Sequence, residues 1–121
     1  MDYDIIQQGG DSMANEYVIS KRDEKLGTVQ LSKSVFESII RITLEEMEGV
    51  FIVDTSWKSG VVPVVHKDND LSVMVDVKLR YGLSAQRVSM KIQEKVVNVI
   101  KQTTDVDIKN VDVKISGFVF E

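Results

Sequence analysis

The sequence predicts an α+β fold, a two-layer sandwich in which two helices cover a mixed or antiparallel sheet. Three observations lead to this prediction. At 121 residues the chain fits one domain and is too short for two ordinary ones. Two segments place apolar residues at helical spacing, so each has one apolar stripe to bury. Several others alternate apolar and polar residues, as half-buried strands do, and the predicted order is strand, helix, three strands, helix, strand.

Residues 1–26 are predicted to lie outside this domain, which then spans residues 27–121. The first fifteen residues contain a glycine pair and show no sustained periodicity, so we expect them to form a mobile tail. The charged stretch that follows is expected to be an approach segment outside the core. Met13 is a candidate for the natural start, and residues 1–12 are then an added or upstream extension.

The first predicted strand runs directly into the first predicted helix. Residues 28–31 alternate, and Ser32 is a candidate N-cap because its hydroxyl can accept a hydrogen bond from the first turn. The helix is expected to reach about Glu48, since Gly49 can supply the left-handed conformation that favours a helix end. Its predicted buried stripe consists of Phe36, Ile39, Ile40, Thr43 and Met47.

Three strands are predicted between the helices. Residues 50–53 are a short β-branched and aromatic run, and a polar loop of residues 54–60 follows. Residues 61–66 form the next strand, which Pro63 places at a sheet edge because proline has no N–H to donate. Residues 71–81 then alternate more clearly than any other segment, so one face of this strand is expected to be buried.

The second helix and the last strand complete the predicted sandwich. Gly82 ends the long strand, and Ser84 is the candidate N-cap of the helix. The last strand is expected from residue 108 to about residue 118 because apolar and charged residues alternate there. The predicted buried stripe of the helix consists of Val88, Ile92, Val96, Val99 and Thr103, widened by Val97 and Ile100.

The composition excludes several classes of function. The chain has no cysteine, which removes disulfides, thiolate zinc sites, iron–sulfur clusters and cysteine nucleophiles. It has one histidine, His66, and therefore no multi-histidine metal site. With 15 basic and 19 acidic side chains, the net charge of -4 disfavours a general nucleic-acid binder. We expect no catalytic, cofactor-binding or metal-binding residue.

The apolar runs of the chain are much shorter than a membrane span. A spanning helix needs roughly 18 or more apolar residues. The first residues are acidic, whereas a secretory signal begins with a basic region and continues with an apolar one. We therefore expect a cytoplasmic location and no direct insertion into a membrane.

Two short motifs have ordinary structural interpretations. Asp68-Asn69-Asp70 is similar to the start of a calcium loop, but Val73 and Leu79 stand where an EF-hand needs glycine and glutamate, so a hairpin turn is expected. His66 precedes this turn, and no serine or threonine stands in a nucleophile-elbow context. A surface histidine is therefore expected rather than a general base.

Three features are candidates for an interaction surface. Basic residues make the second helix positive, which is most often a solvated face and alternatively a nucleic-acid or ligand surface. The tryptophan of the polar loop either closes one end of the core or is an exposed contact anchor. The last two phenylalanines lie on one side of the terminal strand and form an adhesive edge if no helix covers them. The candidate residues are Trp57, Arg87, Lys91, Lys95, Phe118 and Phe120.

Three segments together carry a family resemblance. They are the serine-led helix that ends in Glu48-Gly49-Val50, the strand that ends in Tyr81-Gly82, and the closing strand around Asn110-Val111-Asp112-Val113. With these segments the chain resembles the alkaline-shock-protein family, the envelope stress response proteins of Gram-positive bacteria. The likeness covers residues 27–117 and consists of fold signatures. The loop of residues 57–63 departs from the family pattern because it holds fewer glycines.

The resemblance implies a non-enzymatic, abundant cytoplasmic protein that can self-associate and is often associated with the membrane through a partner. We predict a non-catalytic stress-response or cell-envelope homeostasis protein that acts through protein contacts and self-association. Its expected partners are proteins, a membrane-anchored one among them, and further copies of the chain, whereas nucleic acid is disfavoured. An enzyme is the runner-up class. The other alternative is a small regulatory module that binds nucleic acid or a small ligand through the basic face of the second helix.

Overall fold

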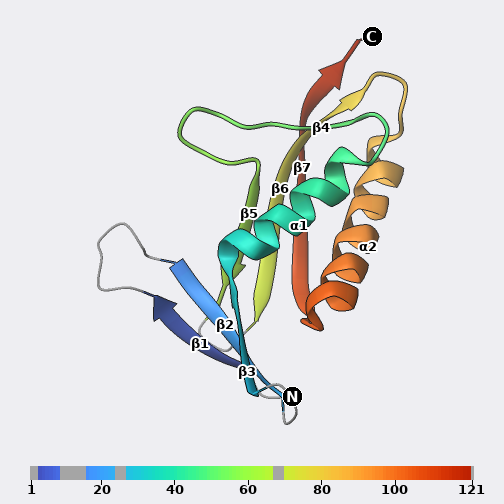
Figure 1. The fold of residues 1–121 in the computed structure, drawn as a ribbon. Coiled ribbons are helices and arrows are strands. Elements are labelled where there is room, and N and C mark those ends of the chain that lie inside the picture. Colours follow the sequence, from blue (N-terminus) through green and yellow to red (C-terminus); the bar gives the residue numbers. More distant parts are fainter. Residues whose placement is uncertain (1–2, 9–15, 24–26, 67–69, 121) are drawn as a thin grey trace.

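Two sheets and two helices make up the structure, a computed structural model that describes residues 3–8, 16–23, 27–66 and 70–120 (Figure 1). An antiparallel three-stranded sheet contains β1 (Tyr3–Gln8), β2 (Glu16–Asp23) and β3 (Gly27–Ser32). A four-stranded sheet contains β4 (Val50–Ile52), β5 (Val61–Val65), β6 (Leu71–Arg80) and β7 (Ile108–Val119). Helices α1 (Lys33–Glu45) and α2 (Ala85–Thr104) both pack on the four-stranded sheet.

Strand β6 is the centre of the four-stranded sheet. It pairs in parallel with β7 along one edge. Along its other edge it pairs antiparallel with β5 over residues 71–75 and with β4 over residues 77–79, so these two short strands lie end to end. The sheet is therefore mixed, and the predicted α+β sandwich is confirmed. Pro63 lies on the edge strand β5, where its missing N–H is harmless, as predicted.

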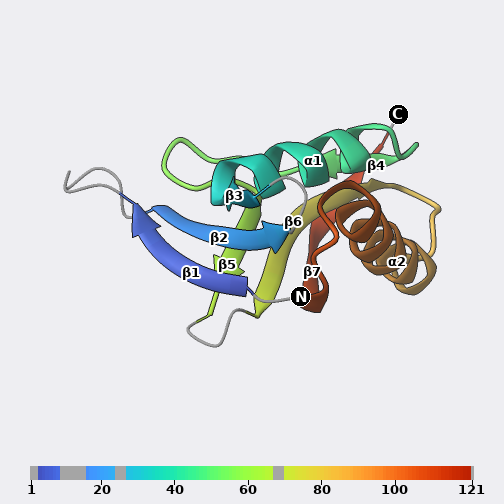
Figure 2. The ribbon, with the colours of Figure 1, turned by 60° about the horizontal axis from the view of Figure 1, so that its bottom comes forward.

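The core lies between the four-stranded sheet and the two helices (Figure 2). The inward residues of β6 are at most 2% exposed, and they are Leu71, Val73, Val75, Val77 and Leu79. The helices meet them with rows at four-residue spacing, which are Phe36, Ile40 and Leu44 on α1 and Ile92, Val96, Ile100 and Thr104 on α2. Two predicted stripe positions are thus wrong by one residue, because these rows bury Leu44 in place of Thr43 and Thr104 in place of Thr103. Val97, predicted to widen the stripe of α2, is exposed instead. Buried Thr104 keeps its hydroxyl satisfied by donating to the Ile100 carbonyl at 2.7 Å.

Both helices begin at the predicted caps. The hydroxyls of Ser32 and Ser84 each accept from the backbone N–H three residues later, at 3.4 Å. Helix α1 ends at Glu45, three residues before the predicted end, because the Met47 N–H turns back to the Leu44 carbonyl in a tighter turn. Gly49 then has a φ of 79°, the left-handed conformation predicted for it.

The three-stranded sheet was not predicted. Strands β1 and β2 pair the short apolar runs at residues 5–6 and 18–19, which are too short to show a period in the sequence. Strand β3, the predicted first strand, pairs with β2 and not with the four-stranded sheet. The expectation that residues 1–26 form a mobile tail outside the domain stays a prediction.

The turn between β5 and β6 is only partly described. The His66 N–H donates to the Asp70 carbonyl at 2.8 Å, as a hairpin closing there requires. Asp68 and Asn69, on which the predicted turn and the alternative calcium loop depend, lie outside the described residues.

Candidate interaction surfaces

The loop that carries Trp57 leaves the sheet between β4 and β5. The Val53 N–H donates to the Asp76 carbonyl at 2.9 Å, and the Asp76 N–H donates to the Gly60 carbonyl at 2.8 Å. One residue of β6 thus bonds to both sides of the excursion. The two short strands therefore behave as one edge strand that is interrupted by a loop of residues 54–59.

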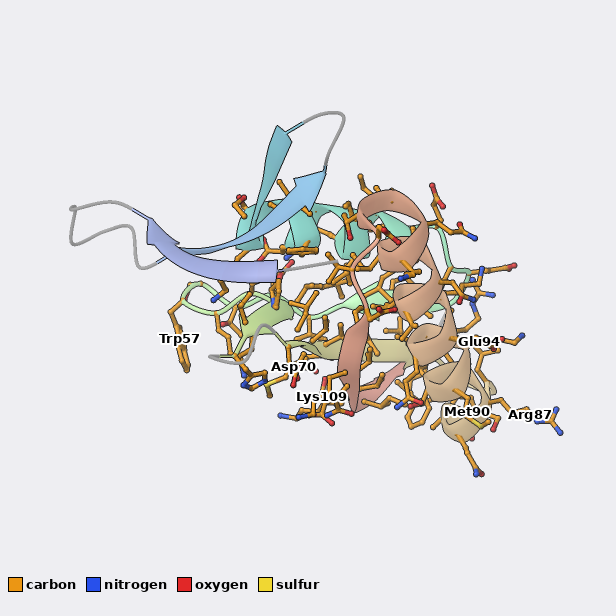
Figure 3. All side chains as sticks on the ribbon, turned by 90° about the horizontal axis from the view of Figure 1, so that it is seen from below. Trp57, Asp70, Arg87, Met90, Glu94 and Lys109 are labelled. Atoms are coloured by element: carbon orange, nitrogen blue, oxygen red, sulfur yellow. The ribbon has the colours of Figure 1, made fainter. Side chains whose placement is uncertain are left out.

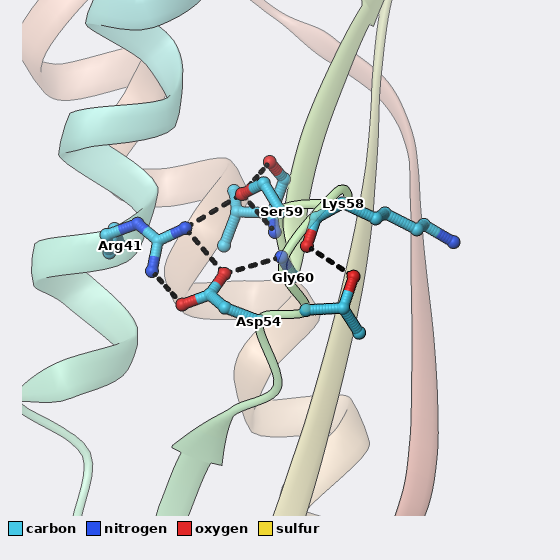
Figure 4. Close-up of polar contacts among 7 residues, drawn as sticks. Arg41, Asp54, Lys58, Ser59 and Gly60 are labelled. Carbon is cyan, nitrogen blue, oxygen red and sulfur yellow. Dashed lines mark hydrogen bonds and ion pairs between the residues drawn. The ribbon is translucent and has the colours of Figure 1, made fainter.

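Polar contacts to α1 hold this loop in place (Figure 4). Arg41 forms a bidentate ion pair with Asp54 at 2.8 and 3.0 Å, and its Nη2 also donates to the Ser59 hydroxyl at 2.8 Å. The Gly60 N–H donates to Asp54 Oδ1 at 2.8 Å. Together, the Arg41 and Gly60 hydrogen bonds lower the pKa of Asp54 to about 2 and the carboxylate raises the pKa of Arg41. The loop is therefore fixed at both of its ends.

Trp57 stands at the tip of this fixed loop. A turn closes around it, because the Thr55 N–H donates to the Lys58 carbonyl at 2.8 Å. The Trp57 side chain is 85% exposed, so it does not close the core. Of the two predicted roles, the exposed anchor is the one that fits.

The basic residues of α2 form one row on its exposed surface. Arg87, Lys91 and Lys95 are all exposed and follow one another at four-residue spacing, so they lie on one side of the helix. Met90 is beside this row and is 61% exposed. Lys101 differs from them, because its ion pairs with Asp107 and Asp105 raise its pKa.

A bulge near the end of β7 determines where the two phenylalanines point. Ile115 pairs with Val77, but Gly117 pairs with Lys78, so Ser116 is an extra residue in β7. The extra residue reverses the alternation, and Phe118 comes to pair with the inward residue Leu79. The Phe118 side chain is thereby turned toward the helix side of the sheet.

Three aromatic rings meet at this end of the molecule. Tyr81 stacks on Phe120 with ring centroids 4.6 Å apart, and it meets Phe118 edge-on at 6.4 Å. The exposed fractions of Tyr81, Phe118 and Phe120 are 65%, 45% and 76%. We call these three residues the aromatic end. Tyr81 was missed as a site residue because its neighbours are almost forty positions away in the sequence.

The candidate residues fall into two groups. Strands β6 and β7 run parallel, so the aromatic end lies at the same end of the molecule as the start of α2 (Figure 1). Trp57 projects from the opposite side to Arg87 and Met90 (Figure 3). The aromatic end therefore lies at the end of the molecule where α2 begins (Figure 1), and Trp57 lies on the other side of the molecule from Arg87 and Met90 (Figure 3).

The described residues show no assembled catalytic constellation. His66 is exposed, as predicted, and its Nε2 lies 3.0 Å from the Ser72 hydroxyl. In the described ranges, no three acidic or histidine side chains gather as metal ligands would. Neither described helix has the length and apolar character to cross a membrane.

Comparison with known proteins identifies relatives in Gram-positive bacteria. A family model named Asp23, described as cell envelope-related in function, matches residues 21–120. The chain is 28% identical over 108 residues to uncharacterized protein Spy1535 of Streptococcus pyogenes, covering 81% of this chain and 84% of that protein. It is 26% identical over 111 residues to uncharacterized protein YqhY of Bacillus subtilis, with 82% of each covered. No solved structure matches. The resemblance to alkaline-shock proteins is confirmed.

Proposed function

Because the chain belongs to the Asp23 family, whose function is cell envelope-related, we propose that it is a non-catalytic protein of envelope homeostasis that acts through protein contacts. Its partners are further copies of the chain and a membrane-anchored protein that keeps it at the cytoplasmic side of the envelope. Stress response is the setting in which we expect these contacts to matter.

The aromatic end carries this proposal. Aromatic residues are enriched in protein interfaces and dominate their binding energy, because they bury a large area at low cost in conformational entropy. Exposing three rings side by side is costly in water unless a partner covers them. Phe118 lies within the paired part of β7, and the other two rings contact it or each other, so less ordering is needed when a partner binds.

The basic row of α2 supports a second candidate function. Its three basic residues, Arg87, Lys91 and Lys95, are exposed. None of them forms an ion pair within the described part of the chain, so they are available to an anionic ligand. A regulatory module that binds nucleic acid or a small anion through this row is the alternative. The net charge of -4 weighs against it.

The solution mass of wild-type and substituted protein tests the proposal. We expect wild-type protein to self-associate with rising concentration in sedimentation velocity, and Phe120→Asp to shift this association to at least about tenfold higher concentration. Phe120 lies outside the core, so the Tm of the variant should stay within a few degrees of wild type. Ile42→Asp is the matched control, because Ile42 is an apolar residue that is 57% exposed on α1 and takes no part in the ring contacts of the aromatic end.

Two results would contradict the proposal. One is a wild-type protein that sediments as a monomer at high concentration in both low and high salt. The other is an equal loss of association in Phe120→Asp and Ile42→Asp, because the aromatic end would then have no special part. Substituting Arg87, Lys91 and Lys95 by glutamine distinguishes the two candidate functions. If the second one holds, this variant loses the binding of anions and still self-associates.

A further inference from the structure

The face of the four-stranded sheet that points away from the helices carries a groove of about 250 Å³. Its floor is built by outward residues of three neighbouring strands, since Val62 pairs with Met74 and Met74 pairs with Asp112. Lys58 and Ser59 of the loop form one wall, and Lys114 of β7 lies on the other side. The groove is smaller than the pockets that take drug-sized molecules or cofactors, so its size suits a single side chain.

The groove exists because the chain leaves the sheet beside Asp76. The backbone neighbour of Asp76 on that edge is Gly60, which has no side chain. Cross-strand neighbours normally cover each other on a sheet surface. Gly60 places no side chain beside Asp76, and the Asp76 side chain lines the groove.

One carboxylate oxygen of Asp76 has no hydrogen-bond partner among the described residues. Its Oδ1 is buried and makes no hydrogen bond, and it is the one such buried side-chain atom among the described residues. Asp112, in the same groove, differs because its Oδ1 accepts from Asn110 at 3.3 Å. A buried carboxylate oxygen without a donor is costly, and a donor brought by a partner would remove that cost.

We propose that this groove binds an arginine side chain of a partner protein, with the guanidinium on Asp76 and the methylene stem against Val62 and Met74. A guanidinium fits because it is weakly hydrated, planar and able to donate two parallel hydrogen bonds to one carboxylate. Met74 is 48% exposed and adapts easily to such a stem. Trp57, next to Lys58 in the loop wall, offers an exposed ring to the same segment of the partner.

The site is separate from the aromatic end. It lies on the opposite face of the sheet, because Asp76 points outward whereas Phe118 pairs with the inward residue Leu79. The proposal therefore does not depend on self-association. The main competitor for Asp76 is Lys114, its cross-strand neighbour in the parallel register.

NMR titration of the whole chain with a capped Ala-Arg-Ala peptide tests the proposal. We expect saturable shifts at the Asp76 carboxyl carbon and at the Gly60 amide. The same peptide with citrulline in place of arginine should bind at least about tenfold more weakly, because it keeps the shape and loses the charge. Asp76→Asn should weaken arginine-peptide binding by a similar factor, and the spectrum of the variant reports whether it is folded.

Three further variants separate the causes. Asp112→Asn is the matched control and should change the affinity by less than about twofold, because Asp112 already has a donor. Phe120→Asp should bind the peptide like wild type, because Phe120 lies outside the groove. Peptide binding therefore tests this proposal even if the proposed self-association fails. Lys114→Met should bind several times more tightly, because it removes a competing cation.

Each opposite result overturns the proposal. Wild-type protein that shows no saturable shift with the arginine peptide has no such site. Equal binding of the arginine and citrulline peptides shows that charge plays no part. Equal effects of Asp76→Asn and Asp112→Asn show that Asp76 is not the receptor. If the Lys114→Met variant binds the peptide and wild-type protein does not, Lys114 already neutralises Asp76 in wild-type protein, and the groove is no arginine site there.

Discussion

The two faces of β6 differ although they belong to one strand. The inward face consists of aliphatic residues that are almost completely buried under α1 and α2. The outward face carries Ser72, Met74, Asp76, Lys78 and Arg80, and Met74 is 48% exposed there. The inward face depends on a local pattern, since every second residue is apolar. The outward face depends on what distant segments place beside it, as the excursion between β4 and β5 does for Asp76.

The largest expected effect comes from the inward face. Leu79→Ala removes a side chain that is 0% exposed and leaves a cavity between the sheet and the helices, so we expect a loss of about 2–5 kcal/mol in the free energy of unfolding. Met74→Ala, on the outward face of the same strand, should cost less than about 1 kcal/mol. Denaturant titration of both variants measures the contrast. Equal losses would mean that both faces are packed alike.

Gly60→Ala tests the excursion that makes the outward face irregular. A Cβ at Gly60 would lie 2.7 Å from Ile52 Cγ2 and closer still to the Val53 carbonyl oxygen, so the backbone has to move. We expect a loss of about 1–3 kcal/mol, the usual cost of overpacking. Gly117→Ala is the control, because its nearest neighbour is Lys78 Cε at 3.7 Å. If Gly60→Ala is as stable as wild type in thermal unfolding, the close approach of the loop to β4 is wrong.

The fold could be predicted from residue 27 onward because its signals are local. Two helical stripes, two serine caps, Gly49 and the alternation of β6 each depend on neighbours a few positions apart. Strands β1 and β2 could not be found, because each has a short apolar run and the hydrogen bonds that define it come from the other. Gly49 was predictable because the residue after a helix end has a strong residue preference. The bulge at Ser116 was not predictable, because it is set by the pairing of β7 with β6.

The candidate surfaces were predicted in part. Phe118 and Phe120 were recognised from their position in the sequence, but Tyr81 was expected within the alternating strand and lies 65% exposed beyond its end. Trp57 allowed two interpretations, because its position is decided by Arg41 binding Asp54 across 13 positions. Asp76 showed no signal in the sequence, since its missing donor is a property of three strands together.

Asp54→Asn tests the polar contacts that fix the loop. The pKa of Asp54 is lowered to about 2 from 3.8, so its contribution to stability is complete above the unfolded pKa and is lost as the pH falls through about 2. Because the Asp54 side chain is 46% exposed, solvent screening reduces this contribution, and we expect about 1 kcal/mol at neutral pH. The difference between wild type and variant should hold down to about pH 5 and shrink from about pH 4 to pH 2.

Denaturant titrations along this pH series measure the difference. Glu48→Gln is the control, because Glu48 is 86% exposed and pairs with Arg80 at 3.1 Å, and such an exposed pair should contribute little at any pH. A difference that grows as the pH falls would have the wrong sign for a carboxylate with a lowered pKa. It would show that Asp54 does not hold the loop through its charge.

The smallest expected effect concerns the three-stranded sheet. The buried contacts that stabilise the protein lie between the four-stranded sheet and its two helices. Strand β1 pairs with β2 and with no strand of that sheet, so deletion of residues 1–11 removes β1 without opening the described core. We expect the Tm to remain nearly unchanged in thermal unfolding. A decrease of more than about 5 °C, roughly 1 kcal/mol for a domain of this size, would show that this segment packs on the domain and that the core is larger than the sandwich.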